Sequence, residues 1–191
     1  FALVRITDNR CIFPDKKIRQ VVEDRIQAPF IATPEDDTII YTMLDLEQYI
    51  GKKITWVTGK TFEDVLMTAG TLPDPLRRHC TTQMKIDPLF QWWRKKINIP
   101  CEFALGFRAN ETKRAKRTLE KTNKKGFLEM KAIVGKRGTR NKWDMIEWQK
   151  PIFPLIKDNI YKDTIETYWK DKSVRFAWMN NCVGCFHKNP L

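Results

Sequence analysis

The alternation of short apolar runs with amphipathic helical patterns is the feature that most restricts the fold of this chain. Apolar or alternating runs at residues 1–6, 53–59 and 101–107 predict β-strands, and the first has the composition of a strand buried on both faces. Residues 34–51 form the clearest helical pattern, since they begin with a proline and three acids and end with a glycine. This order predicts an α/β fold of the Rossmann-like class, with a mostly parallel sheet flanked by helices.

In such sheets, ligands bind beyond the carboxyl ends of the strands. The sequence places RITDN (5–9), WVTGKT (56–61) and GFRANE (106–111) at these ends. We therefore expect a ligand site where these three stretches follow their strands.

The basic charge is concentrated in one segment. The formal net charge is +12, and residues 112–142 hold twelve Lys or Arg but only two Glu. A concentrated patch of this kind indicates, more strongly than evenly spread charge would, a surface that binds nucleic acid or nucleotide phosphate. Its first part, residues 111–125, predicts either a basic helix or a mobile segment. The residues expected to contact nucleic acid are Lys113, Arg117, Lys124, Lys125, Lys136, Arg137 and Arg140.

The five cysteines form an odd set in a chain without a visible secretory signal or an apolar run of membrane-spanning length. This usage indicates a reducing compartment, the cytoplasm. Cys182 and Cys185 have the spacing of half a zinc site, half an iron–sulfur site or a redox dithiol, unless they are two unconnected thiols. Cys80 is a candidate partner in a polar loop, Cys101 and His187 are further candidates, and Cys11 is expected to pack as a small hydrophobe.

Two stretches have the composition of oxyanion sites. RRHCTTQMKIDP (77–88) gathers basic side chains around hydroxyls, and GFRANETKR (106–114) runs from a strand end into a helix start. Each is also compatible with a solvated or capped turn. Within the second stretch, Gly106 permits close backbone approach and Glu111 is expected to cap the helix or orient an arginine. Four tryptophans lie near basic residues in the sequence: Trp92, Trp93, Trp143 and Trp148. We expect most of them in the core, and some could stack on nucleobases.

Taken in order, four motifs resemble the phosphoadenosine-phosphosulfate (PAPS) reductase-like family, in its divergent branch from phages and bacteria. They are RHCTTQMKIDP (78–88), GFRANETKR (106–114), FPLIKDNIYKDTIETYW (153–169) and NNCVGCFHKNP (180–190). The resemblance covers roughly residues 54–190. It implies the Rossmann-like fold of the adenine-nucleotide α-hydrolase superfamily and binding of ATP or PAPS. Relatives in this superfamily transfer sulfur to tRNA or to DNA backbones.

The resemblance also implies site residues. The nucleotide phosphate or sulfate would be bound by Arg78, Lys85, Arg108, Glu111 and Arg114. A zinc ion or iron–sulfur cluster would be held by Cys80, Cys182 and Cys185, with Cys101 or His187 as a possible fourth ligand. If the protein is a transferase, adenylation would activate an acceptor atom for attack by a thiolate or a cluster-bound sulfur.

The chain departs from the family in two places. The Ser-Gly-Gly-rich phosphate loop is not in the sequence, so we expect it before Phe1. Residues 1–191 are expected to belong to a single domain, which we also expect to continue past Leu191. The Glu-Cys-Gly-Leu-His tail is missing as well, so reduction of PAPS to sulfite is not expected. The leading hypothesis is a sulfonucleotide reductase-like or sulfurtransferase-like enzyme. The alternatives are a nucleic-acid-binding protein with a degenerate nucleotide fold and a structural metal, and a regulator whose basic face contacts another protein.

Overall fold

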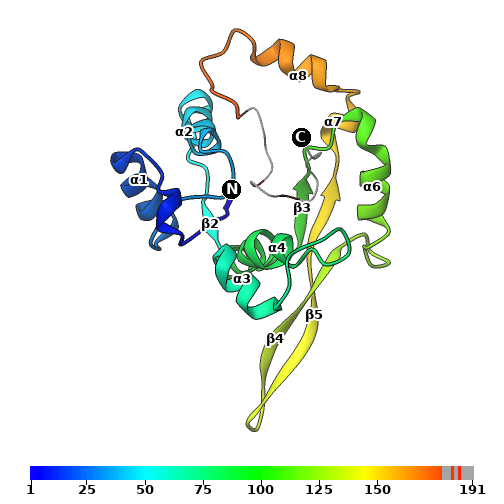
Figure 1. Ribbon diagram of the computed structural model, residues 1–191. Coiled ribbons are helices and arrows are strands. Elements are labelled where there is room, and N and C mark those ends of the chain that lie inside the picture. Colours follow the sequence, from blue (N-terminus) through cyan, green and yellow to red (C-terminus); the bar gives the residue numbers. More distant parts are fainter. Residues whose placement is uncertain (178–181, 183–184, 186–191) are drawn as a thin grey trace. The chain divides into compact units, whose positions relative to one another are not determined.

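The computed structural model describes residues 1–177, 182 and 185 (Figure 1). The chain divides into two compact units. Unit 1 comprises residues 1–92 together with the segment from 173 onward, and unit 2 comprises residues 93–172. The chain therefore leaves unit 1 in the middle of α5 and returns to it before the two late cysteines.

Unit 1 is built on a small parallel sheet with helices. Its elements are β1 (Ala2–Leu3), η1 (Asn9–Cys11), α1 (Lys16–Ile26), α2 (Thr38–Ile50), β2 (Val57–Thr58), α3 (Phe62–Ala69), α4 (His79–Thr81), the π-helical turn η2 (Thr82–Ile86) and the start of α5 (Asp87–Lys96). Strand β1 pairs in parallel with β2, with Ala2 opposite Val57 and Leu3 opposite Thr58. The strands predicted at 1–6 and 53–59 are present, but each is shorter than expected.

Local capping residues determine where these helices begin and end. The Asp15 side chain accepts the first free N–H groups of α1. Thr61 and Asp64 form a reciprocal capping box at the start of α3, and Gly70 ends that helix in the left-handed conformation. Gly51 ends α2 in the same way. The predicted helix stop at Gly51 is confirmed.

Two clusters of buried apolar side chains hold unit 1 together. The larger joins β1, α1, α2 and β2; its members are Leu3, Phe13, Val22, Phe30, Ala32, Ile40 and Trp56. The smaller cluster contains Val4, Val65 and Met84, and joins β1, α3 and η2. Each buried large side chain contributes about 1.5–3 kcal/mol relative to an exposed one. The smaller cluster fixes η2 behind the carboxyl end of β1.

Unit 2 contains a mixed sheet. Its elements after α5 are β3 (Cys101–Ala104), η3 (Ala109–Glu111), α6 (Thr112–Leu119), β4 (Leu128–Arg137), β5 (Arg140–Ile152), α7 (Pro154–Lys157) and α8 (Lys162–Trp169). The strand order is β3-β5-β4, with β3 parallel and β4 antiparallel to β5. A two-residue turn at Gly138, whose φ is 61°, joins β4 to β5 and allows only antiparallel pairing.

Aromatic rings form the interior of unit 2. The Trp93 and Trp148 ring centroids are 6.1 Å apart, and the Phe103 centroid is 6.3 Å from that of Trp148. Phe107 and Phe153 stack at 5.5 Å. Trp93 and Trp148 are 1% and 3% exposed, so both belong to the core, as expected for most tryptophans here.

The described chain is thus α/β, with one parallel and one mixed sheet. The mixed sheet differs from the mostly parallel sheet that the sequence predicts, because the long basic segment folds back on itself as a hairpin.

Among the residues that the structure describes, no helix is both long and apolar enough to cross a membrane.

Candidate nucleotide and cysteine site

Arg5 connects the carboxyl ends of β1 and β2. Its Nε donates to Thr58 Oγ1 at 2.8 Å, and its Nη2 donates to the carbonyl oxygen of Gly59 at 3.0 Å. Burial lowers the pKa of this guanidinium, and the charge of Asp64 partly offsets that effect. The sequence placed RITDN at a strand end but gave no specific role to Arg5; its position directly after the strand was the available signal.

A pocket of about 560 Å³ opens beside the end of β2. Its lining includes the indoles of Trp56 and Trp92, the cation of Lys60 and the polar side chains of Gln83 and Asp87. This volume lies within the range of small-molecule and cofactor sites, and aromatic faces with a cation suit a ligand that carries a planar ring and a negative charge. Burial raises the pKa of Asp87. The pocket follows WVTGKT, one of the three strand ends where we expected a ligand.

Gly59 brings this loop into close contact with η2. A Cβ at position 59 would lie 2.4 Å from the carbonyl oxygen of Gln83 and 3.1 Å from Cγ of Pro88. No other residue type fits there without a shift of backbone. By contrast, a Cβ at Gly106 would meet nothing within 4 Å, so the protein itself does not require a glycine at that position.

Glu35 and Lys85 form an ion pair at one side of η2. The Nζ of Lys85 donates to Glu35 Oε1 at 2.7 Å, and the side chains are 41% and 5% exposed, respectively. A buried carboxylate needs such a partner. The sequence treated Glu35 as an acid at a helix start, but α2 begins only at Thr38. Nothing local in the sequence indicated that Glu35 pairs with Lys85.

Cys182 lies close enough to the charged groups of Glu35 and Lys85 to interact with them electrostatically. The pKa of the Cys182 thiol is raised to about 11, chiefly by burial and next by the charge of Glu35, whereas the charge of Lys85 opposes the rise. Cys185 and Cys80 also raise this pKa, so both thiols are close enough to Cys182 to interact with it electrostatically. The N–H of Cys185 donates to the carbonyl oxygen of Cys182 at 3.0 Å.

Cys80 is less polar in its surroundings than the sequence suggested. It lies in the short helix α4, half-buried against the cluster of Val4, Val65 and Met84. The loop around it is polar, but its side chain faces the apolar cluster. A half-buried thiol in this position is held firmly, which suits a fixed ligand.

The segment that returns to unit 1 is anchored on α2 through Arg175. The guanidinium pairs with Asp45 at 2.7 Å and lies 4.5 Å from the ring centroid of Tyr41. The carbonyl oxygen of Arg175 accepts a bond of 2.6 Å from the Thr42 hydroxyl. Val174, beside it, is buried. These contacts fix the chain shortly before Cys182.

In the described part of the chain, the cysteines do not form a complete set of metal ligands. Within the described part of the chain, no group of three or more His, Cys, Asp or Glu side chains is arranged to hold a metal ion. Cys101 begins β3 in unit 2, and His187 lies outside the described residues. Cys11 is exposed in η1, so the expectation that it packs as a small hydrophobe is wrong; a turn follows β1 there, and the side chain faces solvent. The predicted metal site stays a prediction.

In unit 2, Glu111 orients two arginines. Its Oε2 accepts from the backbone N–H and the Nε of Arg108, both at 3.0 Å, and its Oε1 accepts from Arg114 Nη1 at 3.1 Å. Arg114 also lies 4.3 Å above the Phe107 ring. The Arg108 backbone bond, followed by the two side-chain bonds, lowers the pKa of Glu111. Glu111 therefore caps the turn and orients arginines as expected, and its contribution to any anion site would come through them.

The five predicted oxyanion residues are divided between the units. Arg78 and Lys85 belong to unit 1, whereas Arg108, Glu111 and Arg114 belong to unit 2. The Arg78 side chain is exposed, and its carbonyl oxygen accepts from the backbone N–H groups of Thr81 and Thr82. The guanidinium groups of Arg108 and Arg114, which Glu111 orients, match the geometry of phosphate or sulfate oxygens.

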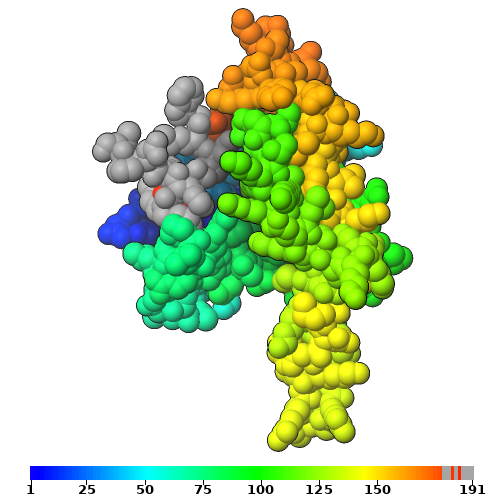
Figure 2. Space-filling view, turned by 90° about the vertical axis from the view of Figure 1, so that its right-hand side faces the viewer, coloured from blue at the N-terminus to red at the C-terminus, as the bar shows by residue number. Residues whose placement is uncertain are grey.

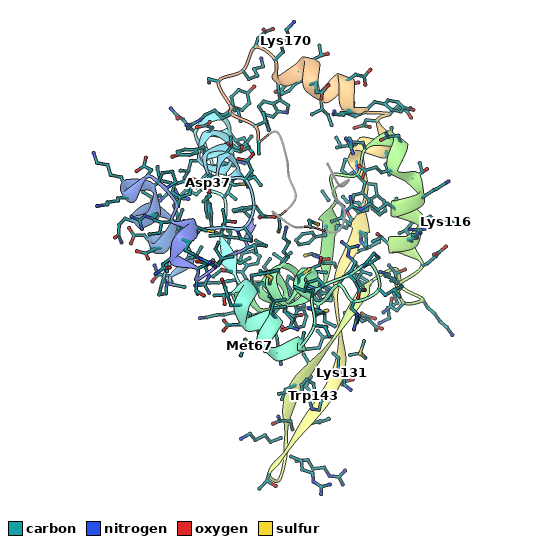
Figure 3. All side chains as sticks on the ribbon, viewed as in Figure 1. Asp37, Met67, Lys116, Lys131, Trp143 and Lys170 are labelled. Atoms are coloured by element: carbon teal, nitrogen blue, oxygen red, sulfur yellow. The ribbon has the colours of Figure 1, made fainter. Side chains whose placement is uncertain are left out.

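The basic segment forms a helix and a hairpin. Lys113 and Arg117 are exposed on α6, and Lys125 pairs with Glu147 at 3.0 Å. The other predicted nucleic-acid contacts are at the connecting turn and at the end of the hairpin; they are Lys124, Lys136, Arg137 and Arg140. In Figure 3 the side chain of Lys116 points outward from α6, and those of Lys131 and Trp143 lie along the hairpin.

Comparisons with protein-family models, with curated proteins and with solved structures gave no match. The resemblance to the PAPS reductase-like family therefore depends on the order of the four motifs in the sequence.

Proposed function

We propose that this protein is an adenine-nucleotide-binding enzyme of sulfur chemistry, sulfonucleotide reductase-like or sulfurtransferase-like. One observation carries the proposal: Cys80 and Lys85 of the RHCTTQMKIDP motif interact electrostatically with Cys182 of the late Cys-x-x-Cys motif. Two motifs far apart in the sequence thus meet, as a shared site requires.

The nucleotide part of the proposal is supported by the pocket beside β2 and by the oriented cations. An adenine ring would stack on Trp92, which lines the pocket and is half-buried. Lys60 in the same lining offers a charge to a phosphate. ATP or PAPS is the ligand class that combines such a ring with oxyanions. Arg108 and Arg114 are oxyanion contacts that only the resemblance to the PAPS reductase-like family implies.

The cysteine part of the proposal is a zinc ion or an iron–sulfur cluster held by Cys80, Cys182 and Cys185. A thiol with a pKa of about 11 is protonated at neutral pH, so Cys182 becomes a ligand only when a cation favours its thiolate. When bound, such a group would supply a redox-active or structural centre beside Lys85. The half-buried setting of all three thiols agrees with this role.

Binding of ATP and PAPS by variants tests the nucleotide site. We expect Arg108→Ala and Lys85→Ala each to weaken binding about tenfold or more, because a charge-assisted hydrogen bond contributes about 1.5–3 kcal/mol. Arg140→Ala and Lys52→Ala are the matched controls, since both side chains are exposed and outside the proposed site. Calorimetric titration measures the dissociation constants.

Loss of Lys85 leaves Glu35 buried and unpaired, so circular dichroism must show that this variant is folded. Arg108→Ala leaves no buried carboxylate unpaired to the same degree, because Glu111 keeps Arg114. Unchanged affinity for both nucleotides in both variants would show that the site assignment is wrong.

A nucleic-acid-binding protein with a degenerate nucleotide fold is the second candidate. It is favoured by the exposed cations of α6 and of the hairpin end. Under this alternative, ATP and PAPS would not bind, whereas DNA or RNA would bind with a strong dependence on salt.

A further inference from the structure

The outer part of the β4–β5 hairpin, residues 131–145, has no role in the site above; we call it the hairpin arm. Apart from Ala132, every residue of the arm is exposed. At about 3.3 Å per residue, the strand extends roughly 16 Å from Ala132 to Arg137. Figures 1 and 2 show the arm, coloured yellow-green to yellow, extending away from β3 and α6 of the same unit.

The base of the arm is firmly attached. Arg94 Nη2 donates to the carbonyl oxygen of Ile133 at 2.5 Å. The Asn123 amide donates to Glu129 at 3.1 Å and to Glu147 at 2.7 Å, which connects the turn after α6 to both strands. An isolated two-stranded hairpin is marginal in water, so these contacts are what keep the arm extended.

The arm carries a strong positive charge without internal partners. It contains five cations and only one acid, Asp144; the cations are Lys131, Lys136, Arg137, Arg140 and Lys142. None of the five forms an ion pair with a residue in the ranges that the structure describes. At the base, by contrast, Lys125 is paired with Glu147. The charge of the arm is therefore available to an external anion.

The two faces of the arm differ. Ile133 is opposite Trp143, and Lys131 is opposite Met145, so these four side chains share one face. Trp143 and Met145 are 53% and 52% exposed, and Lys131 Nζ lies 5.9 Å from the Trp143 ring centroid. A register shift between Ile133 and Gly135 marks a bulge in β4.

Alternation along β5 places Asn141 on the same face as Trp143 and places Arg140 and Lys142 on the other. Lys136 is opposite Asn141, and Arg137 is opposite Arg140. The face of Trp143 thus offers apolar groups and an amide together with two cations, Lys131 and Lys136, and the other face carries Arg137, Arg140 and Lys142. Apolar and amide groups can contact base edges, whereas cations suit phosphates.

The dimensions of the arm fit the groove of one kind of nucleic acid. Its two strands are about 4.8 Å apart, which matches a major groove about 12 Å wide and 8.5 Å deep in B-form DNA. A minor groove about 6 Å wide is too narrow for two strands with side chains, and the major groove of A-form RNA is too narrow as well.

We propose that the hairpin arm docks in the major groove of B-form duplex DNA. The face with Trp143 lies against base edges, and the long cationic side chains of the arm reach the phosphates that line the groove on either side. This inference rests on the nucleic-acid binding given above as the second candidate function and does not depend on the nucleotide pocket.

Fluorescence anisotropy with a labelled 20-base-pair DNA duplex tests the arm. We expect the triple variant Lys136→Ala, Arg137→Ala and Arg140→Ala to bind at least tenfold more weakly. Loss of three phosphate contacts also lowers the slope of log K against log salt concentration by about 2–3. The control Lys16→Ala, Lys17→Ala and Lys52→Ala removes the same charge from exposed positions of unit 1 and should bind like the wild type.

Trp143→Ala separates base contacts from phosphate contacts. We expect it to weaken duplex binding several-fold while leaving the salt slope unchanged, since indole removes no charge. A major-groove ligand such as methyl green should compete with the protein, whereas displacement by the minor-groove ligand netropsin would contradict major-groove docking. Equal affinity for single-stranded DNA or duplex RNA of the same length would also overturn it.

Different results would contradict the arm proposal and the more general proposal of nucleic-acid binding. If Lys113→Ala with Arg117→Ala abolishes duplex binding and the arm variant does not, nucleic-acid binding is retained and the arm proposal is wrong. If the wild type binds no duplex at all, both are wrong. Titration of the arm variant with ATP and PAPS reports the nucleotide site separately.

Discussion

At the scale of single residues, the environment decides the chemistry of identical side chains. Trp93 and Trp148 are buried, whereas Trp143 is 53% exposed, although all three are near basic residues in the sequence. Cys80 is half-buried and Cys11 is exposed. The sequence indicates which side chains have the chemistry to bind a ligand. Their burial in the structure then separates those that pack in the core from those that are accessible to a ligand.

Cys182 gives the clearest prediction at this scale. A rise in the thiol pKa from 9.0 to about 11 means a thiolate fraction about a hundredfold smaller than that of an ordinary cysteine below pH 9. In metal-free protein we expect slow alkylation of Cys182 by iodoacetamide at pH 8 and a steep rise in rate towards pH 11. Mass spectrometry of the labelled peptides measures both rates.

Exposed Cys11 provides the internal reference in the same sample. If Cys182 is labelled as fast as Cys11 at pH 8, the buried, acid-flanked environment described for Cys182 is wrong.

At the scale of elements, the loop between β2 and α3 depends on Gly59. Gly59→Ala would force a Cβ to within 2.4 Å of the Gln83 carbonyl oxygen, so η2 would have to move. We expect the free energy of unfolding of unit 1 to fall by about 1–3 kcal/mol, as for other overpacked sites. Urea denaturation followed by circular dichroism measures this change.

Gly106→Ala is the matched control, because a Cβ there meets nothing within 4 Å. Its unfolding free energy should change by less than about 0.5 kcal/mol. An equal loss in both variants would contradict the steric account of Gly59.

Features set by neighbouring residues were predictable from the sequence. The helix stop at Gly51 depends on a few adjacent groups, and it was predicted. The antiparallel register of the hairpin was not predicted, because it depends on the turn at Gly138. The ion pair of Lys85 with Glu35 was not predicted either, because it joins residues that are distant in sequence and depends on how η2 packs.

At the scale of the whole molecule, chemistry and charge are separated. The cysteine neighbourhood and the pocket belong to unit 1, and the hairpin arm belongs to unit 2. The net charge of +12 is therefore not spread evenly, because residues 112–142 lie entirely in unit 2. This division lets the nucleotide and nucleic-acid proposals be tested independently.

The central claim is that two distant motifs form one centre through Cys80, Cys182 and Cys185. Its most direct test is anaerobic purification followed by analysis of iron, zinc and acid-labile sulfide in the wild type, Cys80→Ala and Cys182→Ala, with Cys11→Ala as the control. We predict a metal centre in the wild type and in the control, and its loss from both site variants. Iron with sulfide would identify a cluster, and zinc alone would identify a structural ion. A metal-free wild type, or a Cys80→Ala variant with full metal content, would contradict the account.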